Sequence, residues 1–187
     1  GRSRARASRS SRGTLAAYGC GALAEILYEW DAAATAYEEA ARLFEAAGNL
    51  DGVCQTWNNL GTVHFYASEF PQAHEAWETS LQWARKANSA KRQADALNNL
   101  GNVALQIGEA AKSLEYYRHS LDIKETLGNK KGMVSALNNL GIACNLLGDY
   151  PKAIEHFERS LRLRDPSDKQ GAARCLGNKL TQINILG

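Results

Sequence analysis

The chain has 187 residues, a formal net charge of +2 and only three prolines. This length suffices for one ordinary domain or a short repeat array. The sequence has no run of 18 or more apolar residues, which excludes a predicted membrane-spanning helix, and its abundant Ala, Leu and Glu favour α-helix throughout.

The first twelve residues differ from the rest in composition. They contain no acidic residue and five of the 22 basic ones, which leaves 17 basic against 20 acidic residues elsewhere; the five are Arg2, Arg4, Arg6, Arg9 and Arg12. Because these arginines alternate with Ser, Ala and Gly without apolar periodicity, we expect residues 1–13 to form a disordered basic tail or linker. Charge alone would let such a tail touch nucleic acid or an anionic surface, but a linker from an upstream segment is the expected interpretation.

Beyond the tail, apolar residues recur at the spacing of amphipathic helices, interrupted by Gly and other turn-forming residues. Asp149 is placed to cap a helix, and Pro151 fits the first turn of that helix, where no backbone N–H is needed. In chain order, the predicted helices cover 14–28, 31–47, 53–67, 72–87, 94–107, 110–127, 134–147, a segment from Asp149 to about Arg164, and 170–186.

The tetrapeptide Asn-Asn-Leu-Gly occurs at 58–61, 98–101 and 138–141, always 40 residues apart. A fixed period of this size predicts a stacked repeat array. Each repeat would be a helix A, a tight turn and a helix B. The first repeat is degenerate, because Tyr18, Gly19 and Cys20 replace Asn-Asn-Leu, although Gly21 keeps the glycine position. The predicted repeats cover about 14–53, 54–93, 94–133 and 134–169, followed by the single helix 170–186.

Small and large residues occupy fixed positions of the repeat. Helices A and B can approach closely only where no side chain intervenes, so we expect the recurring glycine of helix A to face the small and aromatic residues of helix B. The positions in question hold Gly61, Gly101 and Gly141; Leu60, Leu100 and Leu140; Ala33, Ala73, Ser113 and Ala153; and Tyr37, Trp77, Tyr117 and Phe157.

This combination of Leu-Gly, a small residue and an aromatic residue resembles the tetratricopeptide repeat (TPR). Trp57, Leu60, Gly61, Ala73 and Trp77 match the family signature in the second repeat, and the fourth repeat matches it with Leu137, Leu140, Gly141, Ala153 and Phe157. The common TPR has 34 residues, so this chain is more similar to the 40-residue class of Pins-type adaptors, kinesin-light-chain-like cargo binders and bacterial signalling ATPases and regulators. The resemblance implies an all-α, right-handed solenoid of antiparallel helix pairs over residues 14–187.

The resemblance also implies a binding face, because helix A lines the concave surface of TPR arrays. In other TPR superhelices an Asn directly before Leu-Gly holds peptides, a role that falls here to Asn59, Asn99 and Asn139. An Asn side chain has a donor and an acceptor, as a peptide unit does, so a row of them can pair with the backbone of an extended ligand. The first Asn of each pair ranks second, and neighbours at helical spacing complete the candidate peptide-binding residues: Asn58, Asn98, Asn138, Gln55, Phe65, Tyr66, Asn102, Leu105, Gln106 and Asn145.

A second interpretation of the Asn pairs remains open. One Asn of each pair would then bond only to a neighbouring helix and stabilise repeat stacking. The hydrogen bonds of three Asn side chains also supply too little free energy for micromolar binding, so selectivity has to come from other residues of the face.

Several classes of site are not expected. The Asn face carries no Lys or Arg in repeats 2 to 4, which argues against a clamp for a C-terminal carboxylate. The chain has no phosphate-binding glycine loop, no catalytic signature and no metal-ligand spacing, so we expect no enzyme, no cofactor and no metal. No cysteine belongs to a C-x-x-C pair, and Cys20 and Cys144 fall at packing positions, so buried reduced thiols of a cytoplasmic protein are expected.

The sequence therefore predicts a non-catalytic cytoplasmic scaffold, of a signalling kind, that binds a protein or peptide partner in the groove of a TPR array. The alternative is a structural or self-associating spacer or sensor segment of a larger multidomain signalling protein. The initial Gly and the apolar last turn suggest that the chain is a piece of such a protein, with self-association through its terminal repeats.

Overall fold

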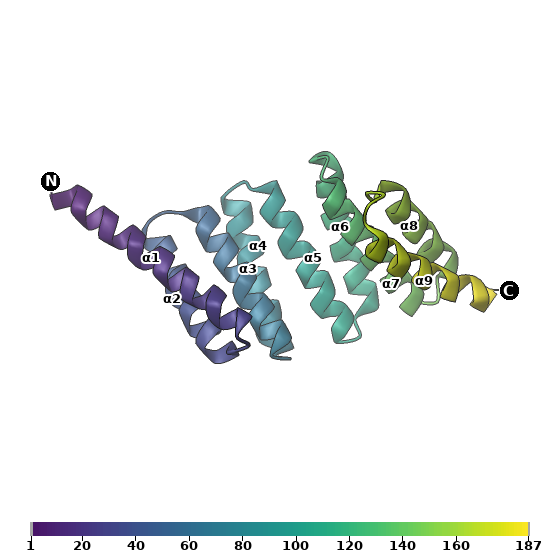
Figure 1. Ribbon diagram of the computed structural model, residues 1–187, viewed down its shortest axis with the longest axis horizontal. Helices are drawn as coiled ribbons and strands as arrows, with labels where there is room; N and C mark the ends of the chain where they lie inside the picture. Colours follow the sequence, from purple (N-terminus) through teal and green to yellow (C-terminus); the bar gives the residue numbers. More distant parts are fainter. Residues whose placement is uncertain (1, 187) are drawn as a thin grey trace. The chain divides into compact units, whose positions relative to one another are not determined.

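The computed structural model describes the backbone of residues 2–186 and the side chains of residues 13–179 and 181. Within that range it has nine α-helices and no strand, which confirms the predicted all-α class (Figure 1). None of these described helices is both long and apolar enough to cross a bilayer. The helices are α1 Arg2–Ile26, α2 Trp30–Ala46, α3 Leu50–Tyr66, α4 Phe70–Lys86, α5 Ala90–Gln106, α6 Ala110–Thr126, α7 Lys130–Leu146, α8 Tyr150–Leu163 and α9 Lys169–Leu186.

The chain divides into two compact units, residues 1–96 and 97–187, with the boundary inside α5. In the first unit α1 packs on α2, α2 on α3, and α3 on α4. In the second unit α6 packs on α7, α7 on α8, and α8 on α9. Packing between consecutive helices is the organisation of an α-solenoid, in which each element is stabilised by its neighbours along the chain.

Three-residue turns set the helix spacing. Helices α2 to α7 each have 17 residues, so one helix and one turn together take 20 residues. In the turn after α2, the N–H of Asn49 donates to the carbonyl of Phe44 at 2.9 Å, and Gly48 between the helices has a φ of +68°. This is the Schellman closure, which needs one left-handed residue and satisfies the last carbonyls of the helix.

The same residue that closes one helix caps the next. The side chain of Asn49 accepts a hydrogen bond from the N–H of Gly52, and that of Asp149 accepts one from Lys152, which confirms the predicted cap of α8. Asn129 caps α7 in the same way. Turn and cap together allow two antiparallel helices to be joined with only three residues between them.

The recurring glycines lie against aromatic rings, as the sequence predicts. A Cβ atom at Gly61 would be 2.5 Å from Nε1 of Trp77, and one at Gly141 would be 2.5 Å from Cε1 of Phe157. Gly21 of the degenerate repeat meets the ring of Tyr37 in the same way. The aromatic residues at this position of helix B are buried in all four repeats, so each ring fills the space that a side chain on helix A would need.

Two details differ from the sequence-based expectations. The predicted starts of α3, α5 and α7 are three or four residues too late, because their first turns are polar and lack apolar periodicity. Cys20 is exposed rather than buried, since the corresponding Leu60 packs on the preceding repeat and the described part of the chain has no helix before α1. Helix α1 begins at Arg2, before the predicted Thr14, and the side chains of residues 1–12 lie outside the described ones, so the predicted tail remains a prediction.

Candidate functional site

The second Asn of the pair in unit 1 bonds to the preceding repeat. The Nδ2 group of Asn59 donates to the hydroxyl of Tyr18 at 2.8 Å and to the hydroxyl of Tyr37 at 3.3 Å. Gln55, one turn earlier on α3, donates to the same Tyr18 hydroxyl at 2.7 Å. The structure thus brings two predicted site residues, Gln55 and Asn59, together around a tyrosine of the degenerate repeat.

Unit 2 repeats this arrangement with different chemistry. The Nδ2 group of Asn139 lies 3.5 Å from Oδ1 of Asn98 and 3.3 Å from Oδ1 of Asn102. The hydroxyl of Tyr117 donates to the same Asn102 oxygen at 2.9 Å. Asn59 and Asn139 therefore both donate to the side chain that lies 41 residues earlier, one repeat back. Their N–H groups join consecutive repeats, as the stacking interpretation requires, while all six Asn side chains remain half-buried.

The first Asn positions contribute in other ways. The carbonyl of Asn58 accepts a hydrogen bond of 2.9 Å from the Trp77 indole. Asn98 accepts from Nζ of the buried Lys124 at 3.4 Å. The Oδ1 atom of Asn138 is buried and has no hydrogen-bond partner among the described residues. Main-chain and side-chain atoms of this position thus serve helix packing in each unit.

The remaining predicted residues separate into packed and exposed ones. Phe65 lies 5.7 Å from the rings of Phe70 and Trp77, and Leu105 packs against the core of unit 2. Tyr66 and Gln106 are exposed, whereas Asn99 and Asn145 are half-buried. Tyr66, with 64% of its surface exposed, is the large apolar side chain on the predicted face that offers most area to a ligand.

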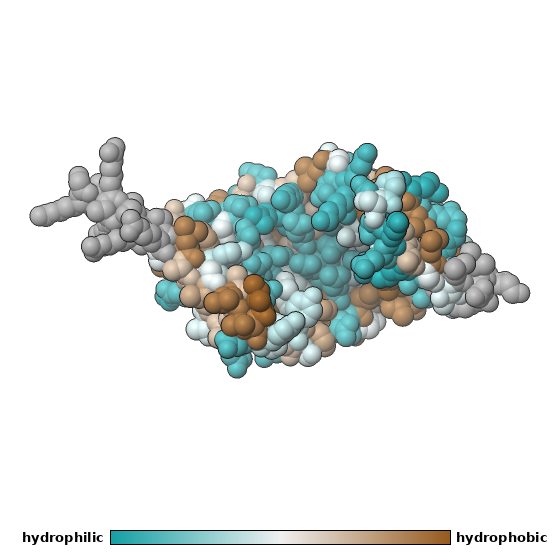
Figure 2. Space-filling model, viewed as in Figure 1, coloured by the Kyte–Doolittle hydropathy of each residue, from teal (hydrophilic) through white to brown (hydrophobic). Residues whose placement is uncertain are grey.

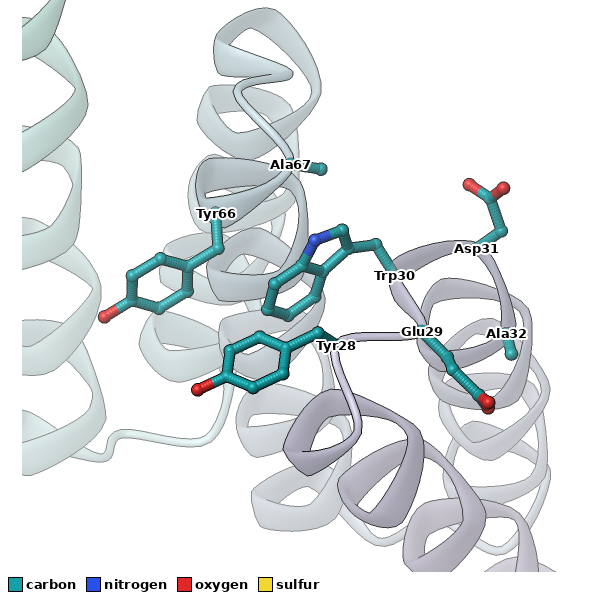
Figure 3. A pocket seen from close by; sticks show the side chains of 7 residues that line it. All are labelled: Tyr28, Glu29, Trp30, Asp31, Ala32, Tyr66 and Ala67. Carbon is teal, nitrogen blue, oxygen red and sulfur yellow. The ribbon is translucent and has the colours of Figure 1, made fainter.

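Tyr66 belongs to a cluster of three aromatic side chains in unit 1, which we call the aromatic pocket. Trp30 stacks on Tyr66 with 6.1 Å between ring centroids, and Tyr28 meets Trp30 edge to face at 5.5 Å. Figure 3 shows the three rings gathered beside the turn between α1 and α2. Two open cavities of about 630 and 720 Å³ share these rings, and Asn59 and Glu25 line the larger one.

The polar atoms beneath the rings form one hydrogen-bonded group. The hydroxyl of Tyr37 accepts from Asn59 and donates to the Glu25 carboxylate at 2.8 Å. Burial, followed by the bond to Glu25, raises the pKa of Tyr37, so the hydroxyl keeps its proton and remains a donor. Among the described lining residues are three carboxylates, Glu25, Glu29 and Asp31, and no Lys or Arg.

Sequence reasoning missed Tyr28 and Trp30. A signal existed in the turns: the residue with positive φ is Gly, Ser or Asn in six of the seven turns between α1 and α8, and Tyr28, at φ +60°, is the exception. A bulky residue in the left-handed region is unfavourable, and such positions are enriched at functional sites. The sequence does not reveal which residue of a turn adopts positive φ, so the exception was visible only in the structure.

Metal and thiol chemistry contribute little to this site. Within the described part of the chain, no group of three His, Cys, Asp or Glu side chains is arranged to hold a metal ion. Cys54, Cys144 and Cys175 are buried free thiols, and burial raises the pKa of each. The site can therefore offer aromatic faces, carboxylates and amides to a ligand.

Comparisons with solved structures identify the same architecture. BtubC (BKLC) from P. vanneervenii is 19% identical with a TM-score of 0.71, and the match covers 98% of this chain and 91% of that one. The apo form of RapI is 15% identical with a TM-score of 0.83 over 89% of this chain, which spans 46% of the RapI chain. At these identities the similarity concerns the fold alone.

Sequence comparisons add the family. A search of curated protein sequences finds no significant match. The profile described as tetratricopeptide repeat matches residues 52–126 and 92–165, more than half of the chain. The match covers the three Asn-Asn-Leu-Gly repeats and their glycine-on-aromatic contacts. The chain therefore belongs to the tetratricopeptide repeat family.

Proposed function

We propose that this chain is a non-catalytic scaffold that binds an extended peptide segment of a partner along its Asn-bearing helix A faces. TPR arrays serve as protein-interaction scaffolds, and the finer assignment is supported by one observation. Asn59 lines a cavity together with Tyr66 from the same helix, while its Nδ2 group bonds to Tyr18 and Tyr37. The amide is thus held in a fixed orientation at the edge of a space that a ligand can enter.

The energetics agree with a shared role for amides and apolar side chains. A hydrogen bond contributes roughly 0.5–1.5 kcal/mol net, whereas micromolar binding needs about 8 kcal/mol. The N–H groups of Asn59 and Asn139 already join repeats, so we assign ligand binding to the accessible remainder of these amides and to Asn99. Apolar contact with side chains such as Tyr66 supplies the rest of the free energy.

The test separates binding from stacking. A random peptide library displayed on phage is selected on the purified chain, and the affinity of the best peptide is measured by calorimetry. We expect Asn59→Ala, Asn99→Ala or Asn139→Ala to weaken that affinity by about 3- to 10-fold, the equivalent of about one hydrogen bond. Tyr18→Phe is the matched control, because it removes the internal partner of Asn59 and leaves the amide in place.

Two results would contradict the proposal. One is a selected peptide whose affinity does not change in any of the three Asn variants while circular dichroism shows the fold intact. The other is an equal loss of affinity in Tyr18→Phe and Asn59→Ala, which would mean that the amide acts only by joining repeats.

The location and context of this function are also part of the proposal. The three buried free thiols are suited to a reducing compartment, which supports a cytoplasmic location. A scaffold without metal or nucleophile chemistry would act by bringing partners together, and we propose a signalling assembly as its setting. Expression of a tagged full-length chain followed by fractionation tests the location.

A second candidate function, self-association, is favoured by exposed apolar residues on α1. Leu15, Leu23, Ile26 and Leu27 are each more than half exposed. Figure 2 shows apolar surface gathered over the C-terminal end of α1. Sedimentation at increasing protein concentration tests this candidate: a constant monomer mass would exclude it, and a dimer that dissociates in Ile26→Glu would support it.

A further inference from the structure

The exposed ring of Tyr28 is not explained by the packing of the chain. Tyr28 has 76% of its surface exposed and occupies a turn position with φ +60°, where four of the other six turns use glycine. Glycine there would remove the unfavourable conformation without loss of a buried contact. A residue that is unfavourable for the fold and remote from the core is therefore suited to a role in binding.

The three rings of the aromatic pocket present π faces and edges around one cavity. Tyr28 and Trp30 are nearly perpendicular, at 85°, whereas Trp30 and Tyr66 are nearly parallel, at 18°. Ile26 and Ala22 line the same cavity and make its wall apolar. Such a cavity accepts a side chain with an aliphatic stem and a cation that lies over an aromatic face.

The charge at the base of the cavity is negative. Glu25 lines it as a carboxylate that accepts a hydrogen bond from Tyr37, and the amide of Asn59 is held next to it by the same hydroxyl. Glu29 and Asp31 line the neighbouring cavity and point away from the rings (Figure 3), so they add to the negative potential without a direct contact. Planar guanidinium groups have five N–H donors, which suits a carboxylate and an amide oxygen beneath aromatic faces.

We propose that the aromatic pocket of unit 1 binds an arginine side chain of the partner peptide. The guanidinium would stack on the rings of Tyr28, Trp30 and Tyr66, with Glu25 as its counter-charge. This inference rests on the proposed peptide-binding function and adds to it the chemistry of the partner: a basic segment.

The test uses three short peptides that differ at one residue. Acetylated, amidated pentapeptides of alanine carry arginine, citrulline or norleucine at the centre, and the indole N–H signal of Trp30 is followed by NMR during titration of the full chain. Citrulline has nearly the shape of arginine without its charge, and norleucine has only the stem. We expect the arginine peptide to bind at least about 5-fold more tightly than either, and this preference to weaken in 0.5 M salt.

The variants make use of the strained turn. Tyr28→Gly should raise the urea midpoint of unit 1, because it relieves the left-handed tyrosine, and at the same time abolish the preference for arginine over citrulline. Ser68→Gly is the matched control: it relieves the same strain at φ +64° in the turn after α3, contributes no ring, and should keep the preference. Glu25→Gln should reduce the preference without removing the rings.

Three results would overturn the inference: equal affinity for arginine and citrulline, equal affinity for norleucine, or an arginine preference that survives in Tyr28→Gly. Each is distinguishable from failure of the proposed function. The pentapeptides probe only the pocket, whereas the Asn variants and the displayed peptides probe the helix A faces, so either can succeed while the other fails.

Discussion

Replacing Gly61 by alanine tests the close contact between helices A and B. The new methyl group would be 2.5 Å from Nε1 of Trp77, whereas apolar atoms prefer about 3.5–4.0 Å, so the ring has to move by about 1 Å. Trp77 is 2% exposed, and its indole donates a 2.9 Å hydrogen bond to the carbonyl of Asn58. The movement therefore strains a packed core and weakens a buried bond at once.

The magnitude follows from three contributions. Overpacking costs about 1–3 kcal/mol, and a weakened hydrogen bond costs up to about 1 kcal/mol. Alanine recovers about 1 kcal/mol because it is a better helix former than glycine. We expect Gly61→Ala to lower the free energy of unfolding of unit 1 by about 1–3 kcal/mol.

Urea unfolding followed by tryptophan fluorescence measures this effect in unit 1, because all four tryptophans, at positions 30, 57, 77 and 83, lie there. With a typical slope of about 1–3 kcal/mol per molar, the midpoint should fall by about 1 M. Gly19→Ala is the matched control: the same substitution in α1 meets no atom within 4 Å and should stabilise the chain by about 0.5–1 kcal/mol. If Gly61→Ala is as stable as the parent chain, the explanation of the recurring glycine is wrong.

Three further predictions concern the turns, an ion pair and the thiols. Ser68→Gly should stabilise unit 1 by about 0.5–1 kcal/mol in the same urea assay, since the relief of a left-handed serine exceeds the added entropy of glycine in the unfolded chain. Asp51 bonds to Arg92 through both carboxylate oxygens at 2.8 Å, which lowers its pKa below 3.8, so this stability is present above about pH 4 and lost as the pH falls through the folded pKa. Asp51→Asn should therefore cost about 0.2–1 kcal/mol at pH 7 and nothing at pH 2 or in 1 M salt, and an equal cost at both pH values would refute the assignment. Of the four thiols, only exposed Cys20 should react rapidly with an aromatic disulfide reagent in the native protein; rapid reaction in Cys20→Ser would contradict the burial of the other three.

Periodicity carried most of the fold from sequence to structure. The 40-residue spacing, the glycine stops and the glycine-on-aromatic contacts were predictable because each follows from local pattern and side-chain volume. The first turns of α3, α5 and α7 were not, since their polar residues carry no period, and only the capping geometry of residues such as Asn49 locates the start. Cys20 was placed wrongly because the pattern of Leu60 was transferred to a helix without a preceding neighbour.

The site was predictable in part. The sequence locates Asn59, Asn139 and Tyr66 on one helix face, but it cannot show that Nδ2 of each Asn donates one repeat back, because that contact joins residues 41 positions apart. The aromatic pocket depends on the backbone conformation of Tyr28 and on a helix packing that brings Trp30 against Tyr66, and neither has a local sequence pattern.

The 20-residue spacing of the backbone has a consequence for how such a chain can lengthen or shorten. A single helix and its turn form a complete geometric step, so an insertion of 20 residues would be accepted by the turns. The side chains, however, alternate with a period of 40, because asparagine and glycine belong to one helix and the aromatic residue to the next. A duplication of one step would place glycine against glycine, leave a void, and turn the amides of every later helix to the opposite side. Viable gains and losses of length are therefore restricted to helix pairs, although the backbone itself would allow half that unit.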